Sequence, residues 1–152
     1  MNDATMLARE FSIAVFRLNG TLIHRGNALV DDLEITSALW QILDALGQSS
    51  DPLSVASIAR NMGLARQSVQ RGVDILYTRG MLEFFPNQHH KRAKLVSLTA
   101  LGTLMLASAQ ERSQPDAETL VKQVGIQALI EATALLRKID NLLSSSPNYR
   151  NE

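Results

Sequence analysis

Cysteine is absent from this chain of 152 residues, and its absence excludes several kinds of chemistry. A chain without thiols has no disulfide framework, no cysteine nucleophile and no redox switch based on thiol oxidation. The common zinc sites that use cysteine ligands are excluded for the same reason. Disulfide-stapled domains, thiol enzymes and cysteine-ligated zinc modules are therefore set aside.

Long apolar runs and net charge are missing as well. No stretch approaches the roughly 18 uninterrupted apolar residues that span a bilayer, and the first ten residues lack the pattern of a secretory signal. The formal net charge is +0, with 45% hydrophobic and 20% charged residues, which is ordinary for a soluble globular domain. We therefore expect a single compact chain, residues 1–152, in the cytoplasm.

Positive charge is nevertheless concentrated in one segment, residues 60–94. Seven bases and two acids lie there, which leaves eight bases and thirteen acids for the rest of the chain. The bases are Arg60, Arg66, Arg71, Arg79, Lys91, Arg92 and Lys94. Attraction to phosphate supplies most of the non-specific affinity for DNA, so a basic segment on a neutral chain points to double-stranded DNA as the leading partner.

Apolar periodicity predicts two helices before the basic segment. Spacings of three and four residues over residues 4–25 indicate an amphipathic helix that ends near Gly26, with a loop over residues 27–34. Thr36 can cap a second helix that stops at Gly47. The apolar stripe of this second helix consists of Leu39, Ile42, Leu43 and Leu46.

Residues 51–78 have the pattern of a helix-turn-helix. Ser54 can cap a short helix that ends at Asn61-Met62-Gly63. A longer helix over residues 65–78 follows almost at once. Its apolar face holds Val69, Val73, Leu76 and Tyr77, and its polar face holds Gln67, Gln70, Arg71 and Asp74. A short helix, a turn with glycine and a longer helix with a polar face make up this DNA-binding motif.

A basic hairpin follows the second of these helices. Residues 82–85 form a short apolar and aromatic run, and residues 93–98 can return antiparallel to it. Residues 87–92 between them form an exposed tip that is too long for a tight turn. A helix-turn-helix followed by a basic hairpin is a winged helix. The predicted fold class is therefore mainly α with a small β-hairpin (α+β), with the winged helix-turn-helix over residues 31–99.

Two further helices are predicted after the hairpin. Thr99 can cap a long helix that Pro115 either kinks or breaks. Gly125 separates it from a last helix over residues 127–144, and the tail over residues 144–152 is expected to fray. The last helix carries two apolar stripes, one of Leu129, Ala132, Leu136, Ile139 and Leu143 and the other of Ile130, Leu135 and Leu142.

Two apolar stripes on one helix need more than one neighbour. One stripe can cover the chain's own first helix and the other a second copy of the chain, and closed twofold pairs are the commonest assemblies. We therefore expect a homodimer in which residues 1–30 and 100–152 form the dimerisation helices. A monomer that uses both stripes internally is the alternative.

The polar face of the longer motif helix carries the candidate base-reading residues. In the major groove Arg can donate twice to guanine, and Gln can exchange two hydrogen bonds with adenine. The expected readers are Gln67, Ser68, Gln70 and Arg71. Arg66 and Ser54 lie near helix starts and are expected to contact phosphates. The alternative is an ordinary solvated helix face with no partner.

The hairpin tip carries the remaining candidates. Lys91 and Arg92, with Lys94 behind them, can reach an adjacent minor groove, where narrow A-T tracts concentrate negative potential. His89 and His90 would diverge as neighbours on a tip and have no partner cluster, so a pH-dependent phosphate contact is favoured over a metal site. No metal or cofactor is expected.

The order and spacing of five segments carry a resemblance to a known family. The segments are Leu53-Ser-Val-Ala-Ser-Ile-Ala-Arg60, Gly63-Leu-Ala-Arg-Gln-Ser-Val-Gln-Arg71, Gly80-Met, Asn87-Gln-His-His-Lys-Arg-Ala-Lys-Leu-Val96 and Leu98-Thr-Ala-Leu-Gly102. They resemble the MarR family of bacterial transcriptional regulators, and the likeness covers nearly the whole chain. It implies a homodimer of winged helices that usually represses transcription from a palindromic operator. A small ligand, frequently phenolic or anionic, often releases such regulators.

Some positions depart from the family pattern. The family often carries Asp-Arg in the wing where this chain has His90-Lys91, so Arg92 competes with Lys91 for the minor-groove role. Ala65 stands where the family commonly has a capping Ser, which costs about 1 kcal/mol unless another group replaces it. The absence of Cys excludes the peroxide-sensing branch of the family, which works by thiol oxidation.

A ligand pocket would lie between the first helix, the second helix and the helix after the hairpin. Phe16, His24, Trp40 and Met105 are of types that can line such a pocket, although each is more often a core or surface residue. The identity of a ligand does not follow from these residues.

Two other classes of function remain as alternatives. A winged helix can be a protein-interaction module whose basic wing docks an acidic partner, and the overall neutrality of the chain is compatible with this. An enzyme is disfavoured, because the chain has no Gly-rich phosphate loop, no His-Glu zinc motif and no nucleophile paired with a base. The three histidines, His24, His89 and His90, form no catalytic constellation with the scattered acids.

Overall fold

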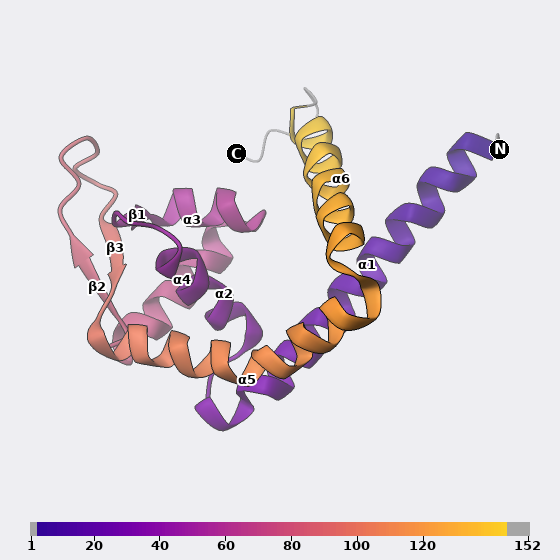
Figure 1. The fold of residues 1–152 in the computed structure, drawn as a ribbon. Coiled ribbons are helices and arrows are strands. Elements are labelled where there is room, and N and C mark those ends of the chain that lie inside the picture. The colour runs from indigo at the N-terminus through magenta and orange to yellow at the C-terminus, as the bar shows by residue number, and fades with distance from the viewer. Residues whose placement is uncertain (1–2, 146–152) are drawn as a thin grey trace. The chain divides into compact units, whose positions relative to one another are not determined.

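The computed structural model describes residues 3–145, which form six α-helices, one 3-10 turn and three short strands (Figure 1). In chain order the elements are α1 (Asp3–Val30), η1 (Asp31–Leu33), α2 (Ser37–Gly47), β1 (Leu53–Ser54), α3 (Val55–Met62), α4 (Arg66–Thr78), β2 (Leu82–Phe85), β3 (Leu95–Leu98), α5 (Ala100–Val124) and α6 (Ile126–Ser144). The predicted fold class, mostly helical with a small antiparallel sheet, is confirmed. The chain divides into two compact units, Met1–Arg112 and Ser113–Glu152.

The core of the first unit forms around α2. All four residues of its predicted apolar stripe are buried, and Leu43 is 0% exposed. The predicted cap is confirmed as well, because Thr36 Oγ1 accepts a hydrogen bond from the Leu39 amide at 3.3 Å. The motif helices and the hairpin contribute Ile58, Val69, Val73, Leu76 and Val96 to the same cluster. Burial of such side chains stabilises a fold by about 1.5–3 kcal/mol each, so this cluster fixes the position of α4.

Helix α1 runs past the residue where the sequence predicts its end. Gly26 lies inside the helix and is buried, and a Cβ there would lie 2.7 Å from Ser37 Oγ. The glycine therefore allows α1 to approach α2 and does not stop the helix. Asn27 is also helical, and its Oδ1 accepts a hydrogen bond from the Ser37 amide at 2.7 Å. The predicted loop over residues 27–34 is wrong as far as Val30, after which a 3-10 turn follows.

The helix-turn-helix predicted from the sequence is confirmed in α3 and α4. Ser54 Oγ caps α3 by accepting a hydrogen bond from the Ser57 amide at 3.1 Å, and Gly63 ends the helix with a φ of 62°. α4 begins at Arg66 with no side-chain cap from Ala65, as its sequence predicts. The buried side of α4 faces the core, so its polar face is turned outward.

A third strand, absent from the sequence prediction, extends the hairpin. β1 has only two residues and pairs antiparallel with β3, with Leu53 opposite Val96 and Ser54 opposite Leu95. β2 pairs with the other edge of β3, so the strand order is β1-β3-β2. So short a strand has no periodicity to detect, and it forms because β3 passes beside it. The pairing joins the start of α3 directly to the hairpin.

Two sets of contacts attach the first part of α5 to the first unit. Thr99 Oγ1 caps the helix by accepting from the Gly102 amide at 3.1 Å, and it donates to the Gly80 carbonyl at 2.7 Å. Further along, Arg112 donates from Nε and Nη2 to the two carboxylate oxygens of Asp32, at 3.0 and 2.6 Å. The hydrogen bond from Arg112 lowers the pKa of Asp32, and the same contact raises the pKa of Arg112.

The second unit holds the end of α5 and all of α6. Of the two alternatives at Pro115, a break is wrong, because α5 continues through this residue. Gly125, with a φ of 92°, separates the two helices as predicted. Within residues 3–145 no single helix is long and apolar enough to cross a membrane, and α5 and α6 pass that test only as a pair bent by 99°. Of the tail that was predicted to fray, residues 146–152 lie outside the described residues.

Gly102→Ala is expected to destabilise the first unit, because a Cβ at this position would collide with the backbone carbonyl oxygen of Met81. Backbone cannot swing aside as a side-chain end can, so we expect a loss of about 1–3 kcal/mol in the free energy of unfolding, measured by urea denaturation. Gly20→Ala is the matched control, since a Cβ there meets nothing within 4 Å, and it should be no less stable than the wild type. Equal stability of the two variants would contradict this packing.

The Arg112–Asp32 ion pair predicts a pH dependence of stability. Because the folded pKa of Asp32 is lowered, the pair stabilises the fold above the ordinary Asp pKa of about 4, and its contribution is lost as the pH falls through the lowered value. Between about pH 5 and about pH 3 the free energy of unfolding should fall more steeply for the wild type than for Asp32→Asn. Asp31→Asn removes the neighbouring charge and should keep the wild-type slope. If the free energy of unfolding depends on pH in the same way in the wild type and in Asp32→Asn, the ion pair does not cause the pH dependence.

Candidate nucleic-acid interface

The helix-turn-helix and the hairpin surround a pocket of about 290 Å³, named here the junction pocket. Its lining consists of Ser54, Val55, Ala56, Arg66, Gln70, Phe84, Arg92, Ala93 and Lys94. Five of these are residues that the sequence predicts to contact DNA, namely Ser54, Arg66, Gln70, Arg92 and Lys94. They come from three separate segments, and the β1–β3 pairing brings the first segment to the last.

The lining of the junction pocket is positively charged. Arg66, Arg92 and Lys94 contribute three cations, and no acid is among the lining residues. The first amides of α3, next to Ser54, add the positive end of a helix dipole. Ser54 Oγ is already engaged, because it accepts the Ser57 amide and shares a 3.0 Å hydrogen bond with the Ser57 hydroxyl. Such a lining suits a phosphate group, which is an anion with several acceptor oxygens.

A second and larger pocket, of about 720 Å³, lies between α3 and the hairpin tip. Lys91 lines it together with His89 and His90. Arg60, which is not among the predicted DNA contacts, also lines this pocket, and its Nη2 donates to Ser57 Oγ at 3.1 Å. No spacing in the sequence identifies Arg60, because its proximity to the hairpin arises only when the strands pair.

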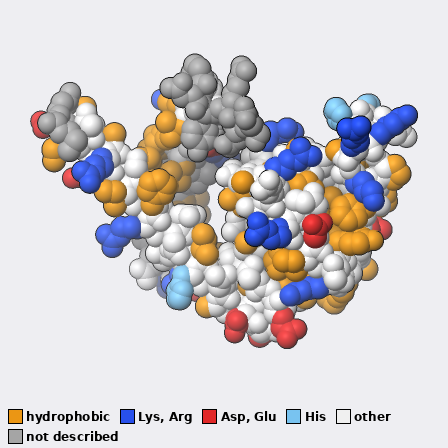
Figure 2. Space-filling model, turned by 180° about the vertical axis from the view of Figure 1, so that it is seen from behind, with side chains coloured by type: hydrophobic (Ala, Val, Ile, Leu, Met, Phe, Trp, Pro, Cys, Tyr) orange, Lys and Arg blue, Asp and Glu red, His pale blue; other side chains and the backbone are white. Residues whose placement is uncertain are grey.

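Asn87 shapes the hairpin tip. Its Oδ1 accepts hydrogen bonds from the backbone amides of His89, at 3.0 Å, and His90, at 3.3 Å. The Ala93 amide then donates to the His90 carbonyl at 3.0 Å. Lys, Arg and His side chains gather at the hairpin tip, at the upper right of Figure 2. In the described part of the chain no group of three or more acids and histidines could hold a metal ion.

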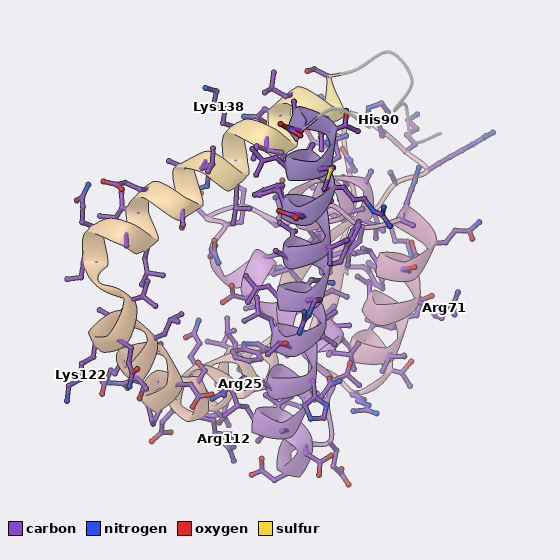
Figure 3. All side chains as sticks on the ribbon, turned by 90° about the vertical axis from the view of Figure 1, so that its right-hand side faces the viewer. Arg25, Arg71, His90, Arg112, Lys122 and Lys138 are labelled. Atoms are coloured by element: carbon purple, nitrogen blue, oxygen red, sulfur yellow. The ribbon has the colours of Figure 1, made fainter. Side chains whose placement is uncertain are left out.

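The other predicted base readers lie on the exposed face of α4. Gln67, Ser68 and Arg71 are exposed and line neither pocket. Arg71 projects outward from its helix (Figure 3). Gln70 connects this face to the junction pocket, and its Nε2 donates to Asp74 Oδ1 at 2.8 Å. One amide hydrogen of Gln70 is thereby occupied, while its Oε1 stays available as an acceptor.

Two arginines, one inside the positive segment and one outside it, serve the fold. Arg79 donates from Nη1 to the backbone carbonyl of Glu34, a residue at a positive φ of 56°. Arg112 is held by Asp32, as described above. Arg79 belongs to the basic segment, but this contact gives it a structural role.

Phe84 is a candidate that the sequence analysis missed. Its ring lines the junction pocket and lies against the ring of Tyr77, with centroids 4.7 Å apart and an interplanar angle of 51°. Lys94 Nζ lies 5.5 Å from the centroid of the same ring. Strand alternation indicates that one aromatic residue of β2 faces inward, but it does not indicate that a cation lies over it. Tyr77, expected on the apolar face of α4, is 51% exposed at the edge of that face.

The four residues predicted to line a ligand pocket have different surroundings. Phe16 is 73% exposed on α1, and His24 is exposed as well. Trp40 and Met105 are partly buried and pack against the core. The indole Nε1 of Trp40 is buried without a hydrogen-bond partner among the described residues. None of the four lines either pocket described above.

Sequence comparison covers the whole helix-turn-helix and the hairpin tip. The family model described as the MarR family matches residues 33–93. An uncharacterized protein of Mycobacterium tuberculosis is 34% identical over 99 residues, which amount to 65% of this chain and 68% of that protein. The range matched by the family model contains both motif helices and most of the residues that line the two pockets.

Solved structures share the fold. A MarR/EmrR family transcriptional regulator from Acinetobacter sp. ADP1 matches with a TM-score of 0.80 at 21% identity, covering 92% of this chain and 99% of that one. A mutant MarR from E. coli, complexed with operator DNA, matches with a TM-score of 0.75 at 20% identity, covering 91% of this chain and 99% of that one. With the family model matched across the winged helix and the same fold throughout, the chain belongs to the MarR family.

Proposed function

We propose that this protein is a homodimeric transcriptional regulator that binds a palindromic operator and represses transcription in the cytoplasm. α4 enters the major groove and the hairpin enters the adjacent minor groove. One observation carries the proposal: Arg66, Arg92 and Lys94 converge on a pocket without acids, beside the exposed polar face of α4. Converging cations next to a helix with hydrogen-bonding side chains supply both the affinity and the base contacts that DNA recognition needs.

The proposed interface divides into positioning and reading contacts. Ser54, Arg66 and Lys94 contact backbone phosphates and fix the register of the protein on the duplex. Lys91 and Arg92 reach the minor groove, where negative potential is concentrated. The base readers in the major groove are Gln67, Ser68, Gln70 and Arg71.

The proposed dimer covers apolar side chains that each unit leaves exposed. α1 has 28 residues and buries only Gly26 and Val30. α6 buries none of its described residues. Within the second unit, an apolar groove of about 420 Å³ is lined by Val121, Ile126, Leu129, Ile130, Thr133, Ala134 and Arg137. Exposed apolar surface of this kind marks an interface, and a twofold pair is the commonest way to bury it.

A small phenolic or anionic effector completes the proposal. It needs only to favour a dimer whose recognition helices are wrongly spaced for two half-sites about one helical turn apart, because coupling is a difference in affinity between two states. The buried and unpartnered Nε1 of Trp40 supports a site beside α2, since a ligand acceptor would satisfy this donor.

Sequencing the DNA that the purified protein selects from random duplexes of about 30 base pairs tests the proposed function. A palindrome should be enriched, and Arg71→Ala should lose about 1–3 kcal/mol of preference for one base in each half-site. Arg66→Ala should instead weaken binding to all sequences and lower the slope of log affinity against log salt by about 0.9 per protomer. If no sequence is enriched, or if binding is insensitive to salt, the protein is not an operator-binding regulator.

Leu136→Glu is expected to weaken the dimer, because it places a charge in the middle of an apolar stripe on α6. Sedimentation at several protein concentrations should show a shift from dimer to monomer. Lys138→Glu is the matched control on the polar face of the same helix and should remain dimeric. A monomeric wild type, or a Leu136→Glu dimer as tight as the wild type, would count against this role of α6.

A further inference from the structure

Three side chains connect the recognition helix, the sheet and the wing. Tyr77 belongs to α4 and Phe84 to β2, and Lys94 is the residue just before β3. The two rings are in contact with their centroids 4.7 Å apart, and the ammonium of Lys94 lies 5.5 Å from the centroid of Phe84. The contacts therefore run without a gap from the helix proposed to read bases to a cation of the hairpin.

The strand register explains why Phe84 and Lys94 meet. Phe84 lies opposite Val96, and Lys94 precedes Val96 by two residues. Residues two apart in a strand point to the same face, so Lys94 lies diagonally across from the Phe84 ring, within reach of a long side chain. Phe85, the next residue of β2, points to the opposite face and is 38% exposed.

The ring has a consequence for the charge of the junction pocket. Arg66 and Arg92 line the same pocket as Lys94, and the three cations repel one another. Lys94 is exposed, so its flexible side chain would otherwise move into solvent, away from the other two cations. Attraction to the negative face of the Phe84 ring opposes this movement and keeps the ammonium at the pocket.

We infer that Phe84 is a positioning residue for DNA binding, which holds Lys94 at the junction pocket so that its ammonium meets a backbone phosphate. Tyr77 supports the ring from the side of α4, so the position of the wing cation is tied to the recognition helix. The gain in affinity comes from pre-organisation, because Lys94 loses less conformational freedom when DNA arrives. The inference rests on the proposed DNA-binding function.

Phe84→Leu and Phe84→Tyr test the inference, with Phe85→Leu as the matched control. Affinities are measured at several salt concentrations, with the duplex enriched by selection and with random duplexes of about 30 base pairs. Phe84→Leu should weaken binding about two- to fivefold per winged helix, the range of an exposed cation–π contact. It should also reduce the salt slope towards that of Lys94→Gln, by at most about 0.9 per protomer. Phe84→Tyr and Phe85→Leu should keep the wild-type affinity and slope.

A double-mutant cycle separates positioning from a general effect on folding. If Phe84 acts through Lys94, Phe84→Leu should have no further effect on affinity in a Lys94→Gln background. Additive losses in the double variant would overturn the inference, as would a Phe84→Leu protein with wild-type affinity and salt slope while the wild type binds DNA. A wild type that binds neither duplex in a salt-dependent way would overturn the proposed function and, with it, this inference.

Proton resonances of the Lys94 side chain provide a readout without DNA. The ammonium nitrogen of Lys94 lies over the Phe84 ring, so the ring should shift the adjacent ε-methylene protons upfield in the wild type and in Phe84→Tyr. The shift should disappear in Phe84→Leu. If Phe84→Leu does not fold, the spectrum of the wild type still tests the inference. Lys94 protons without an upfield shift in the wild type would overturn it.

Discussion

The pairing of β1 with β3 is the contact on which the junction pocket depends. Leu53 lies opposite Val96 and Ser54 opposite Leu95, so the residue that caps α3 is also a partner of the returning strand of the hairpin. Val96 is 0% exposed, and it serves the sheet and the core together. The burial that stabilises the fold therefore also sets the direction of the wing, and with it the distance between the wing cations and the start of α3.

Some basic side chains of this protein stabilise the fold, and others line the junction pocket. Arg79 and Arg112 are held by a backbone carbonyl and a carboxylate, and they attach neighbouring elements of the first unit to one another. Arg66, Arg92 and Lys94 line a pocket without acids, where they repel one another. Such an arrangement contributes little to stability, but it raises the local concentration of anions where the motif helices and the hairpin meet.

Apolar side chains are buried in the core of the first unit but exposed on α1 and α6. The core around α2 is closed by the motif helices, the hairpin, the end of α1 and the first part of α5, and all of its residues belong to the first unit. α1 and α6 keep most of their apolar side chains exposed, and a helix gains most of its stability from packing of its apolar face. Under the proposed dimer, the core of the first unit is closed without a partner, whereas the terminal helices depend on the concentration of the protein.

Interactions between neighbouring residues were predictable from the sequence. Thr36, Ser54 and Thr99 cap the helices expected of them, because a cap acts over about three residues, and apolar periodicity located the buried face of α4 in the same way. The charge count also located the basic segment, although it could not separate Arg79, which serves the fold, from Arg66, which lines the junction pocket.

The tertiary structure alone decided features that depend on which segments pass one another. Gly26 is a contact point between two helices where the sequence indicated a stop, and β1 is a strand only because β3 lies beside it. The contact of Phe84 with Lys94 and the position of Arg60 beside the hairpin also depend on strand pairing. The sequence by itself determined the order of the helices, the two hairpin strands, the caps at Thr36, Ser54 and Thr99 and the polar face of α4, since these follow from local spacing. The junction pocket depends on strand pairing between residues about 40 positions apart in the sequence. The spacing of neighbouring residues does not predict which distant segments pair.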